Sequence, residues 1–230
     1  MVTDYIEVTK ELLDKETAQL TEAEKNAIDM FKRRVERARE FSENANQMLQ
    51  ETCPLTCSGV SKYMIPCSGW ARPIITRIRE IEMLNREGLK HGVIATFDQI
   101  KEKYGTYRGY WTLSHPKVDL GGTDITKMVF AYDELFENYM EDRIEKLVGQ
   151  IETDCQNVCE RCGNEFQMDI PGYKKCCSHG WISYLCETCA KASGNVFTIE
   201  GEPGHLFHRG LEIIEDPYKK GREQRGECAG

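Results

Sequence analysis

Residues 158–190 have the sequence VCERCGNEFQMDIPGYKKCCSHGWISYLCETCA, which contains two Cys-x-x-Cys pairs. Each Cys-x-x-Cys turn can direct two thiolates toward one point, so two such turns together supply the four tetrahedral ligands of a structural zinc ion. We therefore predict a zinc-ribbon-like module whose ligands are Cys159, Cys162, Cys186 and Cys189. The rival interpretations are buried free thiols or a redox pair.

Neighbouring residues could replace one of these ligands, because Cys3His sites also bind zinc stably. The candidate substitutes are Cys155, Cys176, Cys177 and His179. Gly163, directly after the first pair, suits a tight turn with positive φ. Pro171-Gly172 predicts a chain reversal between two strands, Glu165–Ile170 and Trp181–Leu185.

The 230-residue chain has 11 cysteines and a formal net charge of −8. The N-terminal sequence MVTDYIEVTK shows no basic-then-apolar signal segment, and no apolar run reaches the length of a membrane span. We therefore expect a cytoplasmic protein, without a membrane partner, whose thiolates bind metal instead of forming disulfides. The acidic charge argues against dominant non-specific binding to nucleic acid.

We predict an α+β fold that is mainly helical, with an N-terminal helical hairpin, a small central sheet with helices and the C-terminal zinc ribbon. In chain order the expected parts are a helical region (1–52), a central α+β body (53–154), the cysteine module (155–200) and a polar, partly disordered tail (201–230). Apolar spacing predicts a helix from residue 4 to about 20, and the capping box Thr21–Glu24 starts a second helix that reaches Gln50.

The central body contains a predicted loop followed by alternating helices and strands. These elements are a loop over Glu51–Gly69, a helix over Trp70–Asn85, a strand over Gly92–Phe97, a helical or turn segment over Gln99–Tyr104, a strand over Thr106–Leu113 and a long helix from Thr123 or Asp124 to Ile151.

Three further cysteines, Cys53, Cys57 and Cys67, lie close together in the predicted loop. They could form a second metal site, with Cys155 or a histidine as the fourth ligand, or act as small apolar core residues. The chain would then hold two zinc ions instead of one.

Two sets of residues are candidates for contact with a macromolecule. Cations alternate with aromatic rings in one strand, a pattern that can hold phosphates while bases stack, although the same rings could fill the core. These candidate nucleic-acid residues are Lys101, Lys103, Tyr104, Tyr107, Arg108 and Trp111. The second set is an acidic helix face, either solvated or a docking surface for a basic partner, formed by Asp133, Glu134, Glu137, Glu141, Asp142 and Glu145.

A run of basic residues on the second helix, Lys32-Arg33-Arg34 with Arg37 and Arg39, has two interpretations. The simpler one is that these side chains form the solvated face of an amphipathic helix. The alternative is a nucleic-acid contact.

Several short motifs occur in a fixed order between residues 66 and 190: PCSGWARPIITRIREIE, then QIKEKYGTYRGYW, then the first cysteine pair and GWISYLCETCA. In this order they resemble a family of uncharacterised phage and prophage proteins that end in a zinc-ribbon-like module. The resemblance implies a phage protein that works in the cytoplasm of the host cell, but it implies no activity.

We therefore predict a non-enzymatic, zinc-binding phage protein that binds and modulates a host or phage macromolecular complex, for example as an inhibitor of host defence or transcription. The alternative is a zinc-ribbon regulator that binds DNA or RNA. A nuclease of the His-Asn-His or endonuclease VII type is a third candidate, but such sites need a histidine with acidic or Asn partners for a catalytic metal. The sequence between the two cysteine pairs contains only one histidine, His179.

Overall fold

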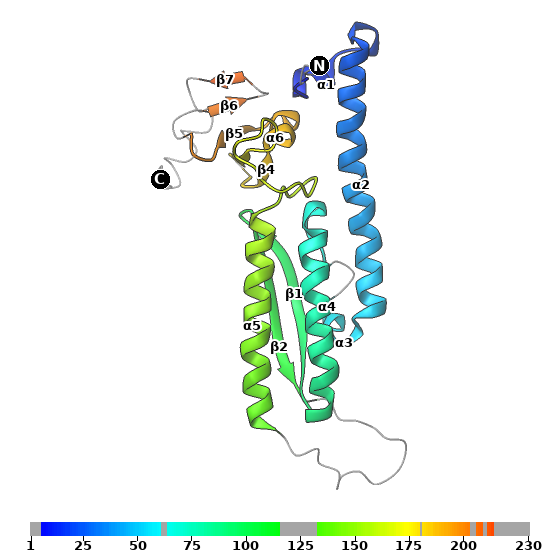
Figure 1. Ribbon diagram of the computed structural model, residues 1–230, viewed down its shortest axis with the longest axis vertical. Helices are drawn as coiled ribbons and strands as arrows, with labels where there is room; N and C mark the ends of the chain where they lie inside the picture. The colour runs from blue at the N-terminus through cyan, green and yellow to red at the C-terminus, as the bar shows by residue number, and fades with distance from the viewer. Residues whose placement is uncertain are drawn as a thin grey trace. The chain divides into compact units, whose positions relative to one another are not determined.

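The computed structural model describes residues 6–60, 64–115, 133–179, 181–202, 206–208 and 211–213. The fold is α+β and mainly helical, with two small antiparallel sheets (Figure 1), as predicted. The chain divides into two compact units. Unit 1 comprises Met1–Arg39 and Asn157–Gly230, and unit 2 comprises Glu40–Gln156. Unit 1 therefore joins two segments that are far apart in the sequence.

Unit 1 begins with two short helical elements in place of the predicted helix from residue 4 to 20. Helix α1 spans only Lys10–Asp14, and the side chain of its N-cap Thr9 accepts a hydrogen bond from the Leu12 N–H at 3.2 Å. A 3-10 turn follows at Thr17–Gln19. The residues after Leu13 are mostly polar, so a further turn of α-helix would have no apolar stripe to bury. Helix α1 therefore ends early. Residues 4 and 5 lie outside the described residues.

The long helix α2 spans Glu22–Thr52 and begins where the capping box predicts. The Glu24 carboxylate accepts a hydrogen bond from the Thr21 N–H at 2.8 Å, and Thr21 Oγ1 accepts one from the Glu24 N–H at 3.2 Å. The hydrogen bonds from Thr21, with a further one from Lys15, lower the pKa of Glu24 to about 2. The part of α2 up to Arg39 belongs to unit 1, and the rest belongs to unit 2.

A five-stranded antiparallel sheet forms the C-terminal part of unit 1, with the strand order β4-β3-β5-β6-β7. A short helix, α6, lies between β4 and β5 in the sequence. The elements are β3 (Lys175–Ser178), β4 (Tyr184–Cys186), α6 (Glu187–Ser193), β5 (Val196–Ile199), β6 (Leu206–His208) and β7 (Leu211–Ile213).

The strand predicted over Glu165–Ile170 is wrong. Glu165 makes a single isolated bridge with Val158, and the residues after it form turns. Local hydrogen bonds, such as that from the Ile170 N–H to the Gln167 carbonyl at 3.2 Å, occupy backbone groups that a strand would pair. The reversal at Pro171-Gly172 is confirmed, with φ of 83° at Gly172. The chain enters the sheet only after this reversal.

Unit 2 consists of a β-hairpin packed against two long helices. Figure 1 shows α4 and α5 alongside the hairpin formed by β1 and β2. The elements, after the end of α2, are α3 (Pro54–Cys57), the 3-10 turn η2 (Ser68–Trp70), α4 (Ala71–Gly88), the 3-10 turn η3 (Leu89–His91), β1 (Ile94–Lys103), β2 (Thr106–Ser114) and α5 (Glu134–Gln156).

The structure confirms the predicted helix over Trp70–Asn85 and the predicted strand over Thr106–Leu113, but the helical or turn segment over Gln99–Tyr104 is wrong. These residues continue β1, after a bulge between Phe97 and Gln99. Tyr104 and Gly105 have φ of 55° and 72°, which is the backbone of a tight two-residue hairpin turn.

Two other boundaries differ from the prediction. The predicted loop over Glu51–Gly69 contains α3, which Pro54 can start because its missing N–H is not needed in a first turn. The start predicted for the long helix, at Thr123 or Asp124, lies outside the described residues. Helix α5 begins at Glu134, and the Asp133 carboxylate accepts a hydrogen bond from the Phe136 N–H at 3.1 Å.

A buried polar network fixes α3 and β1 against α4. The Asn85 amide donates to the Ala95 carbonyl at 2.7 Å and to Thr56 Oγ1 at 2.9 Å, and its oxygen accepts from the Ala95 N–H at 2.7 Å. The buried Glu82 carboxylate accepts hydrogen bonds from the N–H and the hydroxyl of Thr56. A buried polar group left without a partner costs about 1–3 kcal/mol, so this network specifies where the three elements meet.

We expect Asn85→Ala to lower the free energy of unfolding by about 2–4 kcal/mol, because it leaves polar groups of Ala95 unsatisfied in the core. Urea unfolding of the two proteins measures the difference. Met83→Ala, at an exposed position of the same helix, is the control and should change stability by less than about 0.5 kcal/mol. Equal effects of the two substitutions would contradict the role of the network.

Candidate metal centre

The first cysteine pair lies in a tight turn at the start of the C-terminal part of unit 1. The Cys159 carbonyl accepts a hydrogen bond from the Gly163 N–H at 2.9 Å, and the Cys159 N–H donates to the Asn164 carbonyl at 2.8 Å. Gly163 has φ of 72°, as predicted for the glycine after the pair. A side chain at this φ would be strained, so glycine allows the turn to close.

The second pair spans the junction between a strand and a helix. Cys186 is the last residue of β4 and the N-cap of α6, and Cys189 lies within the short helix. The Glu187 N–H donates to the Lys174 carbonyl at 2.9 Å, and the Thr188 N–H donates to the Gly172 carbonyl at 3.1 Å. These bonds attach the start of α6 to the segment that leads into β3.

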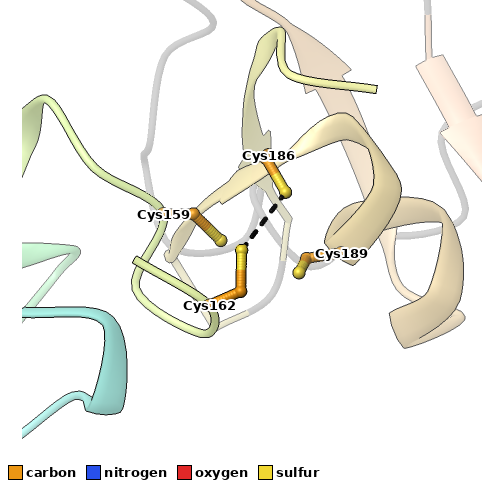
Figure 2. A group of neighbouring side chains, drawn as sticks. All are labelled: Cys159, Cys162, Cys186 and Cys189. Carbon is orange, nitrogen blue, oxygen red and sulfur yellow. Dashed lines mark hydrogen bonds between the residues drawn. The ribbon is translucent and has the colours of Figure 1, made fainter. Parts of the chain in front are cut away.

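The four sulfur atoms converge on one point (Figure 2). They all lie within 4.8 Å of one another, and all four residues are buried. The Cys162 and Cys186 sulfurs are 3.7 Å apart, which is too long for a disulfide bond. Four sulfurs placed tetrahedrally at 2.3 Å from a zinc ion would be separated by about 3.8 Å. The geometry of the cluster could therefore hold a metal ion and is compatible with Zn²⁺.

The electrostatics of the cluster also favour a cation. Hydrogen bonds from the Cys159, Cys186 and Cys189 thiols hold the pKa of Cys162 far below that of an ordinary thiol. The pKa values of Cys186 and Cys189 are raised, first through their hydrogen bonds with Cys159. The four groups therefore cannot all ionise side by side on their own. A divalent ion removes this conflict because it binds every sulfur as a thiolate.

The cluster lies within the apolar core of unit 1, which includes residues from the N-terminal segment. Val8 and Phe31 pack in the same core as the four cysteines, Leu185 and Phe197. The sequence predicted the ligands but missed these two neighbours, because the apolar spacing of α2 shows only that the helix face with Phe31 is buried, and Val8 precedes α1.

The four candidate substitute ligands lie outside the cluster. Cys176 is buried, its thiol donates to the Lys174 carbonyl, and burial raises its pKa. The Cys177 thiol donates to the Ser178 carbonyl at 3.7 Å, and the His179 ring nitrogen Nε2 lies 3.4 Å from the Thr198 hydroxyl. Cys155 is buried in α5 of unit 2. The paired cysteines are thus the set that converges among the described residues.

Cys53, Cys57 and Cys67 do not form a second cluster of ligands in the part of the chain that the structure describes. The Cys57 thiol donates to the Leu49 carbonyl at 3.6 Å, and the Cys53 sulfur lies 3.6 Å from the Thr52 hydroxyl. Burial raises the pKa of Cys57 to about 12, so at neutral pH this residue is a protonated thiol in an apolar core.

The candidate nucleic-acid residues are divided between the two faces of the β1–β2 hairpin. Tyr107 is only 1% exposed, and burial raises its pKa, so its ring belongs to the core and is not accessible to a base. Residues two apart in a strand share a face, so Trp111 lies on the same side and is partly buried.

The opposite face of the hairpin carries the cations. Lys101 pairs in register with Arg108, and its ammonium lies 4.8 Å from the centre of the exposed Tyr110 ring. Lys103 lies 5.3 Å from the centre of the exposed Tyr104 ring. Arg108 forms an ion pair with Glu152 of α5 at 3.2 Å. The nearby carboxylate weakens the attraction of Arg108 for an anionic ligand. An exposed basic and aromatic strip therefore remains, with Tyr110 in place of the two buried rings.

The predicted acidic face of α5 is only partly available. Asp133 caps the helix and approaches His91 at 3.1 Å, and Glu137 approaches His115 at 3.4 Å. The remaining four residues are exposed, but Arg143 and Lys146 are exposed on the same helix, so it carries both signs of charge. Those four are Glu134, Glu141, Asp142 and Glu145.

No protein-family model, curated protein sequence or solved structure matches the chain. Within the described residues, no helix combines the length and the apolar character needed to cross a membrane. The functional argument therefore depends on the geometry of the cysteine cluster and of the surfaces around it.

We expect the protein purified with zinc to hold one zinc ion per chain, as measured by native mass spectrometry. The variant Cys162→Ser should lose the ion, because a serine hydroxyl is a poor substitute for a thiolate ligand. Cys177→Ser is the matched control, since its thiol lies outside the cluster, and it should keep the ion. Equal metal contents in the two variants would contradict the assignment of ligands.

Proposed function

We propose that the protein binds one Zn²⁺ as a structural ion and acts by docking on another macromolecule, without catalysing a reaction. The observation that carries this proposal is the convergence of four buried cysteine sulfurs. Four thiolates fill the tetrahedral coordination of zinc and leave no position for water or substrate. A catalytic zinc site, by contrast, keeps one position open.

The docking part of the proposal is supported by an exposed aromatic side chain in the cysteine module. Trp181, in the turn between β3 and β4, is 77% exposed, and Ile182 beside it is partly exposed. Tryptophan is enriched among the residues that contribute most to protein–protein affinity. An exposed tryptophan on a small structural module therefore favours a protein partner.

The turn that presents Trp181 is held by the buried Ser178. The Ser178 hydroxyl donates to the Trp181 carbonyl at 2.6 Å and accepts from the Ser183 N–H at 3.0 Å. The Ser178 N–H donates to the Ser183 carbonyl at 3.0 Å. A backbone that is fixed before binding loses less conformational entropy on association, so this turn suits a docking residue.

The resemblance of residues 66–190 to phage and prophage proteins supports a more specific proposal. In it, the partner is a host or phage complex, and binding inhibits a host process such as defence or transcription. The acidic residues of α5 would then contact a basic region of the partner, because complementary charge increases the rate of association.

The second candidate is binding of DNA or RNA, and the exposed strip of the hairpin favours it. Lys101 and Lys103 lie on the same face as Arg108 and each approaches an exposed tyrosine ring. Cations beside accessible rings can hold phosphates while bases stack. A nuclease is the weakest candidate, because the sequence between the cysteine pairs supplies a single histidine, His179, without an adjacent acidic residue, and a metal-dependent nuclease needs a histidine together with acidic or Asn ligands.

A pull-down from host lysate, treated with nuclease, tests the proposal with the zinc-loaded protein as bait. We expect a stoichiometric protein partner that survives the nuclease, and we expect Trp181→Ala to reduce its capture at least about tenfold, as for an interface hot spot. Met83→Ala, which removes a similarly exposed apolar side chain from α4, is the control and should keep the partner.

The same experiment distinguishes the second candidate. If nuclease removes every partner, and if Lys101→Gln with Lys103→Gln weakens binding to a nucleic acid while Lys146→Gln on α5 does not, the protein is a nucleic-acid-binding regulator. Capture that is insensitive to Trp181→Ala would contradict docking through the turn. Metal-dependent cleavage of nucleic acid that Trp181→Ala leaves intact and His179→Ala abolishes would establish an enzyme.

A further inference from the structure

Arg34 of α2 has a partly buried side chain, and two of its three guanidinium nitrogens are buried without a hydrogen-bond partner among the described residues. Its Nε and Nη2 atoms are shielded from solvent and find no hydrogen-bond acceptor among the described residues. A buried cation without a compensating negative charge is strongly destabilising. The position of Arg34 therefore implies that an anionic group lies nearby when the protein is in its functional state.

The surroundings of Arg34 identify this anionic group. Its guanidinium carbon lies 5.6 Å from the centre of the Phe31 ring, and Phe31 packs in the core that contains the four cysteines. Phe31 and Arg34 are three residues apart and so share one face of α2. The Arg161 guanidinium, from the turn between Cys159 and Cys162, lies 5.5 Å from the same ring. The helix thus brings Arg34 to the side of the cluster.

The electrostatics agree with this placement. Burial by itself lowers the pKa of Arg34, but interaction with Cys162, Cys189 and Cys186 outweighs burial and raises the pKa above its ordinary value. The direction of this shift agrees with the placement of the guanidinium on Phe31, in the core that holds the four sulfurs.

Charge balance gives this arrangement a role. Four thiolates around one Zn²⁺ carry a net charge of −2, and this charge is buried in an apolar core. One guanidinium beside the sulfurs would reduce the local charge to −1. Groups outside the coordination shell commonly change metal affinity by about 10- to 100-fold. Because charges interact more strongly where the dielectric constant is low, the Arg34 cation can change the affinity of the sulfurs for zinc in this way.

We propose that Arg34 is a positioning residue of the metal centre, whose buried positive charge compensates the four-thiolate site and increases its affinity for zinc. The inference rests on the proposed structural zinc. It also changes the interpretation of the basic run on α2, because Arg34 serves the metal centre while Lys32, Arg33 and Arg37 are exposed to solvent.

Three variants separate the charge of Arg34 from its packing. Arg34→Met keeps most of the apolar length and removes the charge, whereas Arg34→Lys keeps the charge on a similar length of side chain. Arg37→Met removes an exposed arginine one turn further along the same helix and is the matched control. The zinc affinity of each purified protein is measured by competition with a chromophoric chelator.

We expect Arg34→Met to weaken zinc binding by about 10- to 100-fold, and both Arg34→Lys and Arg37→Met to remain within about threefold of the wild-type chain. If Arg34→Met does not fold, Arg34→Gln replaces it as the neutral variant, with the same expectation. An affinity that is unchanged in the neutral variant, or a loss that lysine does not restore, would overturn the inference. A wild-type chain that binds no zinc would refute the proposed function itself.

Discussion

The convergence of four cysteine thiols at the centre of unit 1 is the constraint on which the rest of that unit depends. The sulfurs are buried with Val8, Phe31 and Phe197, so they occupy space that an ordinary core would fill with hydrocarbon. Four thiolates this close together in an apolar core would repel one another, so the sulfurs cannot all be charged without a cation. Metal binding would remove this repulsion and stabilise the folded unit, because the site assembles only when both cysteine pairs and the surrounding segments are in place.

Unit 2 is stabilised in a different way. Its core contains fully buried apolar side chains such as Trp70, Ile78 and Met140, together with a buried polar network centred on Asn85. Its buried cysteines, Cys53, Cys57 and Cys155, do not converge, and the sulfurs of Cys53 and Cys57 lie within hydrogen-bond distance of nearby oxygen atoms of the chain. The two units therefore illustrate two uses of cysteine within one chain. In one unit four thiols converge as candidate metal ligands, and in the other the buried thiols act as small apolar residues.

The sequence was sufficient to predict features that depend on local spacing. Two Cys-x-x-Cys pairs identify the cluster, the capping box identifies the start of α2, and apolar periodicity identifies α4. It was insufficient where the outcome depends on pairing between segments. Residues 99–103 form a strand because β2 supplies partners in register, with Tyr104 in the hairpin turn. Residues 165–170 do not form a strand, because local turns satisfy their backbone groups. The role of Arg34 was hidden for the same reason, since its neighbours at the cluster lie more than one hundred residues away in the sequence.

Hydrogen exchange of the backbone amides, with zinc bound and after its removal by a chelator, tests the central claim most directly. If the four-thiolate site organises unit 1, removal of the metal should abolish protection in residues 159–189, β5 and the α2 turn around Phe31, while the β1–β2 hairpin of unit 2 keeps its protection. Unchanged protection throughout unit 1 after complete removal of the metal would contradict the account.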